Sequence, residues 1–486
     1  MLEYSPATSK AQTHPPSLWI LSGVYACFTL ALGVCMANLL LYFNHHTQLG
    51  NDHSFQVYAA FNSLAFTLPL IGGLLCDKFG FRNTATIGLG LSFIGLAIFA
   101  IPSEQSIFLG LAVFLVGNLY CTPAIWSLIT MLYERSDSRR DSGSTIFYML
   151  FNIGFLLANL TSGFVGEAIG WHLTFLLYGT PSLIAFFVFF FLRGKIKTHE
   201  EVITGERRFQ RSSAYGITWL LIWAIILTPV CYILLNFVII NDIILWSMVL
   251  VSFVYIWHLS MKHKKNDSRQ SGRLKAFLFL CIVAMAYLII FNSEFGLLPV
   301  FAENNLNREI AGITFPGEII TSLDPAYCIV IGLFYSWLWV KLDKYRKNPS
   351  LPTKFTWGLI FAACGYLLLS LILFNFLNIK FSILWLFLVF LLFVAGELLV
   401  VPIGIAMVGK LSPEGHEGLL MGIWNLMTGA GALLTGYIAS FTVIPKSDTL
   451  TQSNLQYLWV FLSIGIVVLI IGLFMLWVKK FIIKLI

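Results

Sequence analysis

Long apolar runs dominate this chain and constrain its fold more than any other feature. We count fourteen, each about 20 residues or longer, the length that a helix needs to cross the hydrocarbon core of a bilayer. Only 11% of the 486 residues are charged, against roughly 25% in soluble domains. The sequence therefore predicts an all-α integral membrane protein with spans at 18–43, 55–76, 83–102, 106–132, 145–167, 171–193, 215–235, 238–260, 275–300, 324–342, 355–377, 381–409, 418–444 and 456–478.

The basic residues orient these spans. Lysine and arginine gather in alternate loops, and of the 30 in the chain the intervening loops hold only Arg308, Lys380 and Lys446. Because cytoplasmic loops are enriched in basic residues, both termini are predicted to be cytoplasmic. The polar N-terminus and the long first run are unlike a cleavable signal. We expect a multi-pass protein of the inner (cytoplasmic) membrane.

The two longest basic loops divide the chain. They enclose the pair of runs at 215–235 and 238–260, and removing this pair leaves six runs before it and six after it. Two six-helix bundles around a central site are the plan of a rocker-switch transporter. We predict an N-terminal bundle at 1–197, a linker with two extra transmembrane helices at 198–274 and a C-terminal bundle at 275–486. The extra pair is expected to face lipid.

Several function classes are disfavoured. We find no phosphate loop, no H-E-x-x-H, no G-x-S-x-G and no C-x-x-C, so no enzyme, metal site or cofactor is expected. The eight cysteines lie mostly in apolar runs, as buried thiols do. The net charge of +7 comes from loops between spans and does not indicate nucleic acid. We expect a monomer in the lipid bilayer that acts on a small molecule.

The segment GGLLCDKFGFRN, residues 72–83, resembles the signature loop of the major facilitator superfamily. Gly73, Asp77, Gly80 and Arg82 fall on its spacing. The glycines permit a tight turn, and Asp77 can cap a helix end and pair with a cation from a neighbouring helix, which would hold one conformational state. The alternative is an ordinary turn at the membrane face.

Three further blocks resemble the proton-dependent oligopeptide transporter (POT) family. They are RRDSGSTIFYMLFNIGFLLANL at 139–160, the segment 300–339 that begins VFAENNLNREIAG, and GELLVVPIGIAMVGKLSP with its following LLMGIWNL at 396–426. The resemblance covers nearly the whole chain. It implies a major facilitator fold with twelve core helices plus two between the halves, and uptake of di- or tripeptides driven by a proton gradient.

Glu397 is the only charged residue in the run 381–408. An ionised side chain at a bilayer centre costs at least about 2.5 kcal/mol, so the acid needs a function. The resemblance implies that Glu397 holds the amino terminus of a peptide or a proton, that Asn152 faces the same cavity, and that Tyr148 and Trp424 shape side-chain pockets. The alternative for each is packing within the bundle. Pro402 and Gly404 would let the Glu397 helix bend for gating.

The chain departs from the family where positive charges are expected. No Asp, Glu, Lys or Arg occurs from Ala11 to Asn51, so the first helix lacks E-x-x-E-R. Thr122 stands at the lysine of the fourth helix. The acid of the seventh helix is displaced to Glu294, a shift of two residues that turns it about 200° around a regular helix. Asp324 replaces an asparagine at the outer end of its helix.

These departures predict a cavity that is neutral on one side and acidic on the other. Glu397 and Glu294 are the candidates for proton coupling, and Glu294 is expected to be the only other acid in the membrane interior. Such a cavity would favour a cation. Proton-coupled peptide uptake therefore has two alternatives: transport or exchange of an amine-bearing or cationic solute without standard proton coupling, or a nutrient receptor that does not transport.

Overall fold

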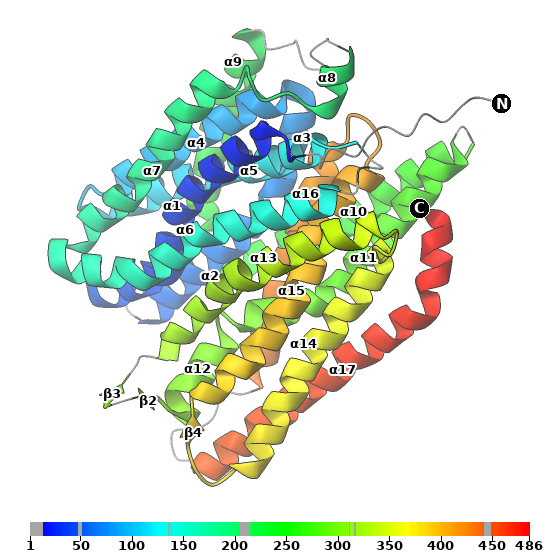
Figure 1. Cartoon of the computed structure of the whole chain (residues 1–486). Helices are drawn as coiled ribbons and strands as arrows, with labels where there is room; N and C mark the ends of the chain where they lie inside the picture. The colour runs from blue at the N-terminus through cyan, green and yellow to red at the C-terminus, as the bar shows by residue number, and fades with distance from the viewer. Residues whose placement is uncertain are drawn as a thin grey trace.

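The computed structural model describes residues 13–46, 51–134, 137, 139–204, 214–265, 267–310, 312–314, 317–441 and 449–486, and almost all of them are helical (Figure 1). The elements are α1 (Pro16–His46), α2 (Asn51–Thr67), α3 (Pro69–Phe79), α4 (Phe81–Phe99), α5 (Glu104–Met131), α6 (Arg139–Ile169), α7 (Trp171–Leu192), α8 (His199–Thr204), α9 (Ala214–Leu234), α10 (Val238–His263), α11 (Ser268–Ser293), α12 (Leu297–Asn305), β1 (Leu306–Asn307), β2 (Glu309–Ile310), β3 (Ile313–Thr314), a 3₁₀ turn η1 (Gly317–Ser322), α13 (Leu323–Lys344), α14 (Leu351–Asn375), β4 (Phe381–Ser382), α15 (Leu384–Leu411), α16 (Glu417–Ser440) and α17 (Leu450–Leu485).

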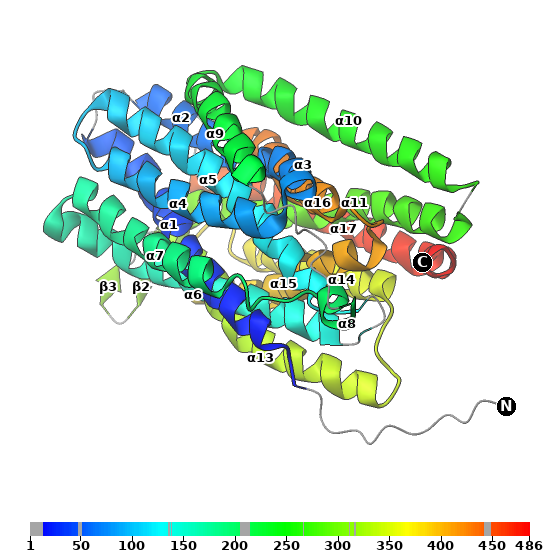
Figure 2. The same cartoon turned by 90° about the horizontal axis from the view of Figure 1, so that it is seen from above.

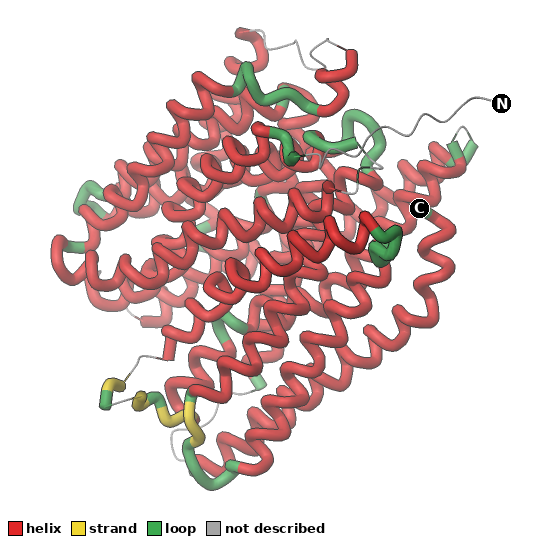
Figure 3. Tube along the Cα trace, in the orientation of Figure 1, coloured by secondary structure: helices red, strands yellow, loops and turns green. Residues whose placement is uncertain are grey.

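Within these residues, fourteen helical segments are long and apolar enough to cross a membrane, as the sequence predicted. Three of them are interrupted. One changes from α2 to α3 before Pro69, one from α11 to α12 across residues 294–296, and one begins in η1 and continues as α13. The start of α1 and the end of α17 lie on one side of the molecule, which we call the terminal face (Figure 1). The short strands lie on the opposite side (Figure 3), where β1 pairs with β4 and β2 with β3.

The helices pack in two groups. In the N-terminal group, α1 packs on α6 and α7, and α4 packs on α5 and α7; in the C-terminal group, α14 packs on α15 and α17, and α11 packs on α15 and α16. Small residues let these helices approach closely. For example, a Cβ atom on Gly110 of α5 would lie 2.6 Å from the carbonyl oxygen of Gly95 of α4. The exact domain limits at residues 197 and 274 stay predictions.

The extra helices α9 and α10 lie outside the two groups. Many of their apolar side chains are exposed, as expected of a lipid-facing pair; Ile225 and Val251 are two examples. The two helices have different partners. The N-terminal group packs against α9 through α4 and α5, whereas α10 contacts α2 of that group together with α11 and α16 of the other (Figure 2). Thus α10 lies across the boundary between the groups.

The two groups meet closely near the terminal face, where α3 packs along α16. A Cβ atom on Gly422 of α16 would lie 2.6 Å from the Cα atom of Leu70, so only glycine fits there without a shift of one helix. Ser142 of α6 bonds the hydroxyl of Ser336 of α13 at 2.8 Å, which adds a polar contact between the groups. This face is closed in the structure.

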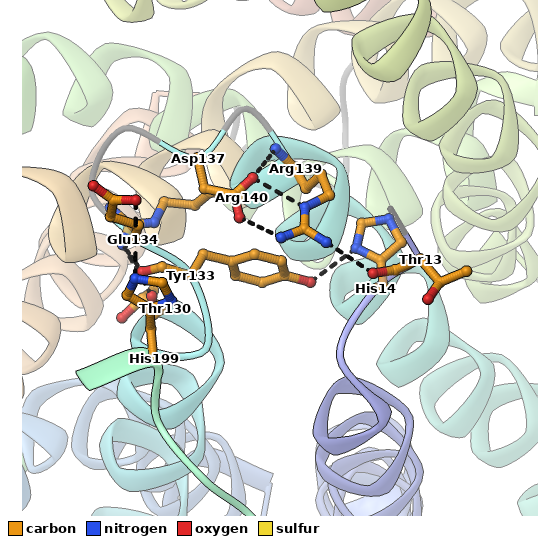
Figure 4. Close-up of polar contacts among 9 residues, drawn as sticks. All are labelled: Thr13, His14, Thr130, Tyr133, Glu134, Asp137, Arg139, Arg140 and His199. Atoms are coloured by element: carbon orange, nitrogen blue, oxygen red, sulfur yellow. Dashed lines mark hydrogen bonds and ion pairs between the residues drawn. The ribbon is translucent and has the colours of Figure 1, made fainter. Parts of the chain in front are cut away.

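Polar contacts also hold the segment before α1 against the ends of α5 and α6 (Figure 4). His14 and the hydroxyl of Tyr133 share a hydrogen bond of 2.9 Å. Arg139 donates to the carbonyl of Thr13 at 2.8 Å and pairs with Asp137 at 2.7 Å. The chain that leads into α1 is therefore fixed to the N-terminal group.

Substituting Gly422 by alanine tests the close packing of α3 and α16. The added methyl group has to push against the backbone at Leu70, and overpacking of this kind costs about 1–3 kcal/mol. We expect a lower midpoint of thermal unfolding, measured by intrinsic fluorescence in detergent. Gly436→Ala on the same helix is the control, because a Cβ atom there meets nothing within 4 Å. Equal midpoints for the two variants would contradict the close contact.

A second prediction concerns pH. Burial, and then the neighbouring Arg139, lower the pKa of His14 below its ordinary value of 6.5. The neutral ring is therefore favoured in the folded protein, so the stability that this site contributes is complete above pH 6.5 and is lost as the pH falls through the lowered value. We expect the unfolding midpoint to fall less between pH 7.5 and 5 in His14→Gln than in the unsubstituted protein. The same fall in both would show that His14 does not contribute.

Candidate functional site

Glu397 lies in the middle of α15 and is completely buried. The packing of the preceding residue, Gly396, determines the direction in which the Glu397 side chain points. A Cβ atom on Gly396 would lie 2.6 Å from the carbonyl oxygen of Gly358, so α15 packs tightly on α14 at this level. Because successive residues of a helix are about 100° apart, Glu397 points away from that contact. It is directed toward the N-terminal group.

Tyr148 of α6 meets Glu397 there. Its hydroxyl donates a hydrogen bond to Oε1 of Glu397, and this contact joins the two helix groups in the buried interior. Asn152 lies one turn further along α6, is also buried, and donates its amide to the backbone carbonyl of Tyr148 at 2.9 Å. The structure thus brings Tyr148 and Glu397 together and places Asn152 one turn away. Among the described hydrogen bonds, none joins Asn152 to Glu397.

Asp324 joins this site, which the sequence did not lead us to expect. It lies in the first turn of α13 and is only 3% exposed. A carboxylate oxygen of Asp324 and one of Glu397 lie within 4.8 Å of each other. Cys328, one turn later, donates its thiol to Oδ1 of Asp324 at 3.5 Å. The expectation of an outer position was wrong because η1 precedes α13 within the same span, so the start of α13 lies deeper in the protein.

Glu294 is the third acid. It follows the last residue of α11, in the interruption before α12, and it is completely buried. It interacts electrostatically with both Asp324 and Glu397. In a regular helix, Glu294 would have pointed away from Glu397. Because the helix is interrupted here, Glu294 can point toward the other acids. The expectation that Glu294 and Glu397 are the only interior acids was wrong, because Asp324 lies with them.

The N-terminal group offers an uncharged network. Thr122, at the position where the family has lysine, bonds the hydroxyl of Tyr25 at 3.1 Å and donates to Asn118 at 2.7 Å. Asn118 in turn donates to the carbonyl of Ala65 at 2.7 Å. The polar groups of α1, α2 and α5 thus satisfy one another without a formal charge, in agreement with the expected neutral side.

The oxygen and sulfur atoms of Asp324, Cys328 and Glu397 all lie within 4.8 Å of one another. Such a set of carboxylate and thiol groups has the chemistry to hold a cation, whether an ammonium group, a proton or a metal ion.

Trp424 packs elsewhere along α15. Its indole ring covers Gly404, where a Cβ atom would overlap the ring, and its centroid lies 6.3 Å from that of Phe355. It is 1% exposed. Pro402 lies inside α15 between this contact and Glu397. Trp424 and Gly404 therefore form a packing contact in the C-terminal group, and the described contacts do not join them to the acidic cluster.

The signature loop lies at the terminal face. Asp77 accepts the backbone N–H groups of Gly418 and Leu419 at 2.8 Å each, so it caps the first turn of α16. Gly73 faces the carbonyl of Gly418 so closely that a Cβ atom would overlap it. The predicted helix cap is present, and it crosses between the two groups.

Gly80 and Arg82 follow in the same loop. Gly80 has a φ of 94°, a value that L side chains rarely adopt, and it separates α3 from α4. Arg82 donates to Glu201 of α8 at 2.9 Å. The short helix α8, which the sequence assigned to the linker, is therefore attached to the N-terminal group.

Sequence analysis missed one more contact between the groups. The predicted span 355–377 left Lys354 in the preceding loop, but Lys354 lies in α14, is 1% exposed and forms an ion pair with Asp141 of α6. Its Nζ atom lies 3.9 Å from the centre of the Trp339 ring. The only signal in the sequence was Asp141 within the block at 139–160; its partner is 213 positions away and could not be identified from one sequence.

Comparisons with known proteins agree with this architecture. A dipeptide and tripeptide permease B of Edwardsiella piscicida is 29% identical over 450 residues, which cover 90% of this chain and 89% of that protein. The uncharacterized transporter YclF of Bacillus subtilis (strain 168) is 28% identical over 423 residues, or 85% of each chain.

Solved structures show the same fold. A peptide transporter POT in complex with sulfate superposes with a TM-score of 0.70 at 24% identity, covering 98% of this chain and 97% of that one. A bacterial homologue of the human drug peptide transporters PepT1 and PepT2 gives 0.73 at 20% identity, covering 97% and 99%. The fold is that of the major facilitator superfamily, with twelve core helices and two inserted ones. The POT family model matches residues 82–460, most of the chain, and the chain is a member of the POT family.

Proposed function

We propose that the chain is a secondary transporter that takes up di- or tripeptides, or related peptide-like solutes, together with protons. Membership of the POT family supports transport, and the permeases among its relatives support a peptide substrate. The observation that carries the site assignment is the buried contact of Tyr148 with Glu397, which joins the two helix groups at one acid. A site between two groups is where alternating access needs its ligand.

The residues divide into two tasks. Glu397 is the group that would meet the ammonium of a peptide, with Tyr148 fixing its orientation and Asn152 available to a peptide backbone one turn away. Asp77, the Gly73–Gly418 contact and the Lys354–Asp141 pair close the terminal face, so they have to separate when that face opens. We place the terminal face in the cytoplasm, because the basic loops lie there. The protein would act as a monomer in the cytoplasmic membrane, without a cofactor.

A second candidate function is supported by the charge distribution. The cluster holds three acids, whereas Thr122, Tyr25 and Asn118 supply only neutral polar groups on the other side. A free carboxylate on the ligand would therefore find no positive partner among these residues. An amine-bearing or cationic solute fits this arrangement better than an ordinary zwitterionic dipeptide.

Uptake into proteoliposomes with and without an inward proton gradient tests the function. Zwitterionic dipeptides, C-terminally amidated dipeptides and simple amines are the solutes to compare. We expect saturable uptake of at least one peptide-like class, stimulated by the gradient. Binding without uptake of any of these solutes would contradict transport and favour a receptor.

The variant Glu397→Gln tests the site. Loss of one charge-assisted hydrogen bond, worth about 1.5–3 kcal/mol, should reduce the apparent affinity for the solute by roughly 10- to 100-fold. The matched control is Glu104→Gln, the same substitution at an exposed position at the start of α5. Equal affinities of the two variants for the solute would show that Glu397 does not bind it.

The variant Asp77→Ala tests closure of the terminal face. A cysteine introduced at Ser127, which is buried and whose hydroxyl reaches the carbonyl of Glu417, should react faster with a polar maleimide when the cap of α16 is lost. The experiment uses a Cys364→Ser background, because Cys364 is exposed. Asp267→Ala is the control, since Asp267 caps α11 without joining the two groups.

We expect Asp77→Ala to raise the labelling rate several-fold and Asp267→Ala to leave it unchanged. The same rate in all three proteins would show that the Asp77 cap does not hold this face closed.

A further inference from the structure

Three acidic side chains from three separate helices meet in the buried interior. Glu397 belongs to α15, Asp324 to the first turn of α13, and Glu294 to the interruption after α11. Each is at most 3% exposed. Both carboxylate oxygens of Glu294 lack a hydrogen-bond partner among the described residues, although they are completely buried. Burying three carboxylates without compensation is costly, so the cluster has to gain positive charge from a bound species.

Among the residues that the structure describes, no basic side chain supplies that charge. In the part of the chain that the structure describes, no Lys or Arg forms an ion pair with any of the three acids. The titratable groups that face them come from four helices: Tyr148 of α6, Tyr287 of α11, Cys328 of α13 and Tyr366 of α14. All four are neutral in their ordinary state and can donate a hydrogen bond, but none brings a positive charge.

The closeness of Asp324 and Glu397 identifies one bound species, because a carboxylate oxygen of one buried acid lies within 4.8 Å of a carboxylate oxygen of the other. An ionised carboxylate only accepts hydrogen bonds, so two carboxyl groups can bond each other only if one of them carries a proton. Two carboxylates that share a site also repel each other strongly when both are ionised. We propose that Asp324 and Glu397 form a proton-sharing carboxyl pair, and that this pair is the proton-binding site which the chain uses for coupling.

The neighbouring groups fit this assignment. Tyr148 donates to Oε1 of Glu397, and Cys328 donates to Oδ1 of Asp324. Each carboxyl group thus has one donor that stabilises negative charge, and Oε2 of Glu397, which has no hydrogen-bond partner among the described residues, is available to hold the shared proton. The pair with one proton has a net charge of −1. Glu294 is outside the pair and interacts with it only through electrostatics.

The charge of the carboxyl pair also determines which ligand can bind beside it, and this step rests on the proposed function. A single ammonium group neutralises the singly charged pair without displacing the proton, so ligand and proton occupy the site together. Loss of the proton would leave two negative charges and hold the ammonium more tightly. Transport should therefore depend on pH through two residues that act as one unit.

Infrared spectroscopy of the purified, ligand-free protein tests the pair directly. A protonated carboxyl group has a C=O stretch separate from that of a carboxylate, and it shifts in D₂O. We expect a protonated-carboxyl band that persists at pH 7.5. The variants Asp324→Asn and Glu397→Gln should each shift or remove that same band, because either change removes one of the two carboxyl groups that share the proton.

Two controls make this result specific. Asp343→Asn is the same substitution on the same helix, at a partly exposed position near the end of α13, and should leave the band unchanged. Glu294→Gln should also retain it. The proposal is overturned if Asp324→Asn leaves the band of the unsubstituted protein intact, or if it removes a band that Glu397→Gln does not affect.

The pH profile of transport gives an independent readout. Asp324→Asn should flatten the pH dependence of gradient-driven uptake, whereas Asp343→Asn should preserve it. An unchanged profile in Asp324→Asn would exclude the pair from coupling. The two assays also separate the hypotheses, because the infrared result does not require any solute to be transported. If no solute were taken up, the proposed function would be contradicted. The infrared band would still decide whether the carboxyl pair exists.

Discussion

The hydrogen bond from Tyr148 to Glu397 is the contact on which the interior of this protein depends. It joins α6 of one helix group to α15 of the other at a point remote from water. A hydrogen bond to a charged or proton-sharing carboxyl is strong in a medium of low dielectric constant, and a buried acid without it would be costly. The close packing of Gly396 on Gly358 holds α15 in the orientation that makes the contact possible.

Charge is distributed unequally around this contact. The N-terminal group contributes hydroxyl and amide groups that satisfy one another, as in the chain from Tyr25 through Thr122 to Asn118. The C-terminal group contributes the acids. Where a bipolar site would select a zwitterion by matching both of its ends, a site with one charged side selects through the cation alone. The other end of the ligand is then recognised by shape and by neutral donors and acceptors.

Much of the fold could be predicted from the sequence, because hydrocarbon thickness sets the length of each spanning helix. All fourteen spans lie where the apolar runs placed them.

The site was harder to predict. Glu397 was identifiable as a lone acid in an apolar run, but Asp324 was not, since its depth depends on the 3₁₀ turn before α13. Glu294 depends on an interruption after α11, for which Gly296 and Pro299 were signals in the sequence that we did not use. Lys354 looked like a loop residue because its partner Asp141 is distant in sequence. Local patterns therefore predict the elements, whereas the irregular ends of helices determine which polar residues meet.

The position of α10 has a consequence for the lipid bilayer. This helix contacts α2 of one group and α11 and α16 of the other, while its outer side is apolar and exposed. If the two groups rock against each other, α10 has to slide on at least one of them, and its lipid-facing surface moves with it. Hydrophobic thickness and tilt then enter the energy difference between the two states. The inserted pair would make the rate of the cycle sensitive to membrane composition, although neither helix contributes a residue to the acidic cluster.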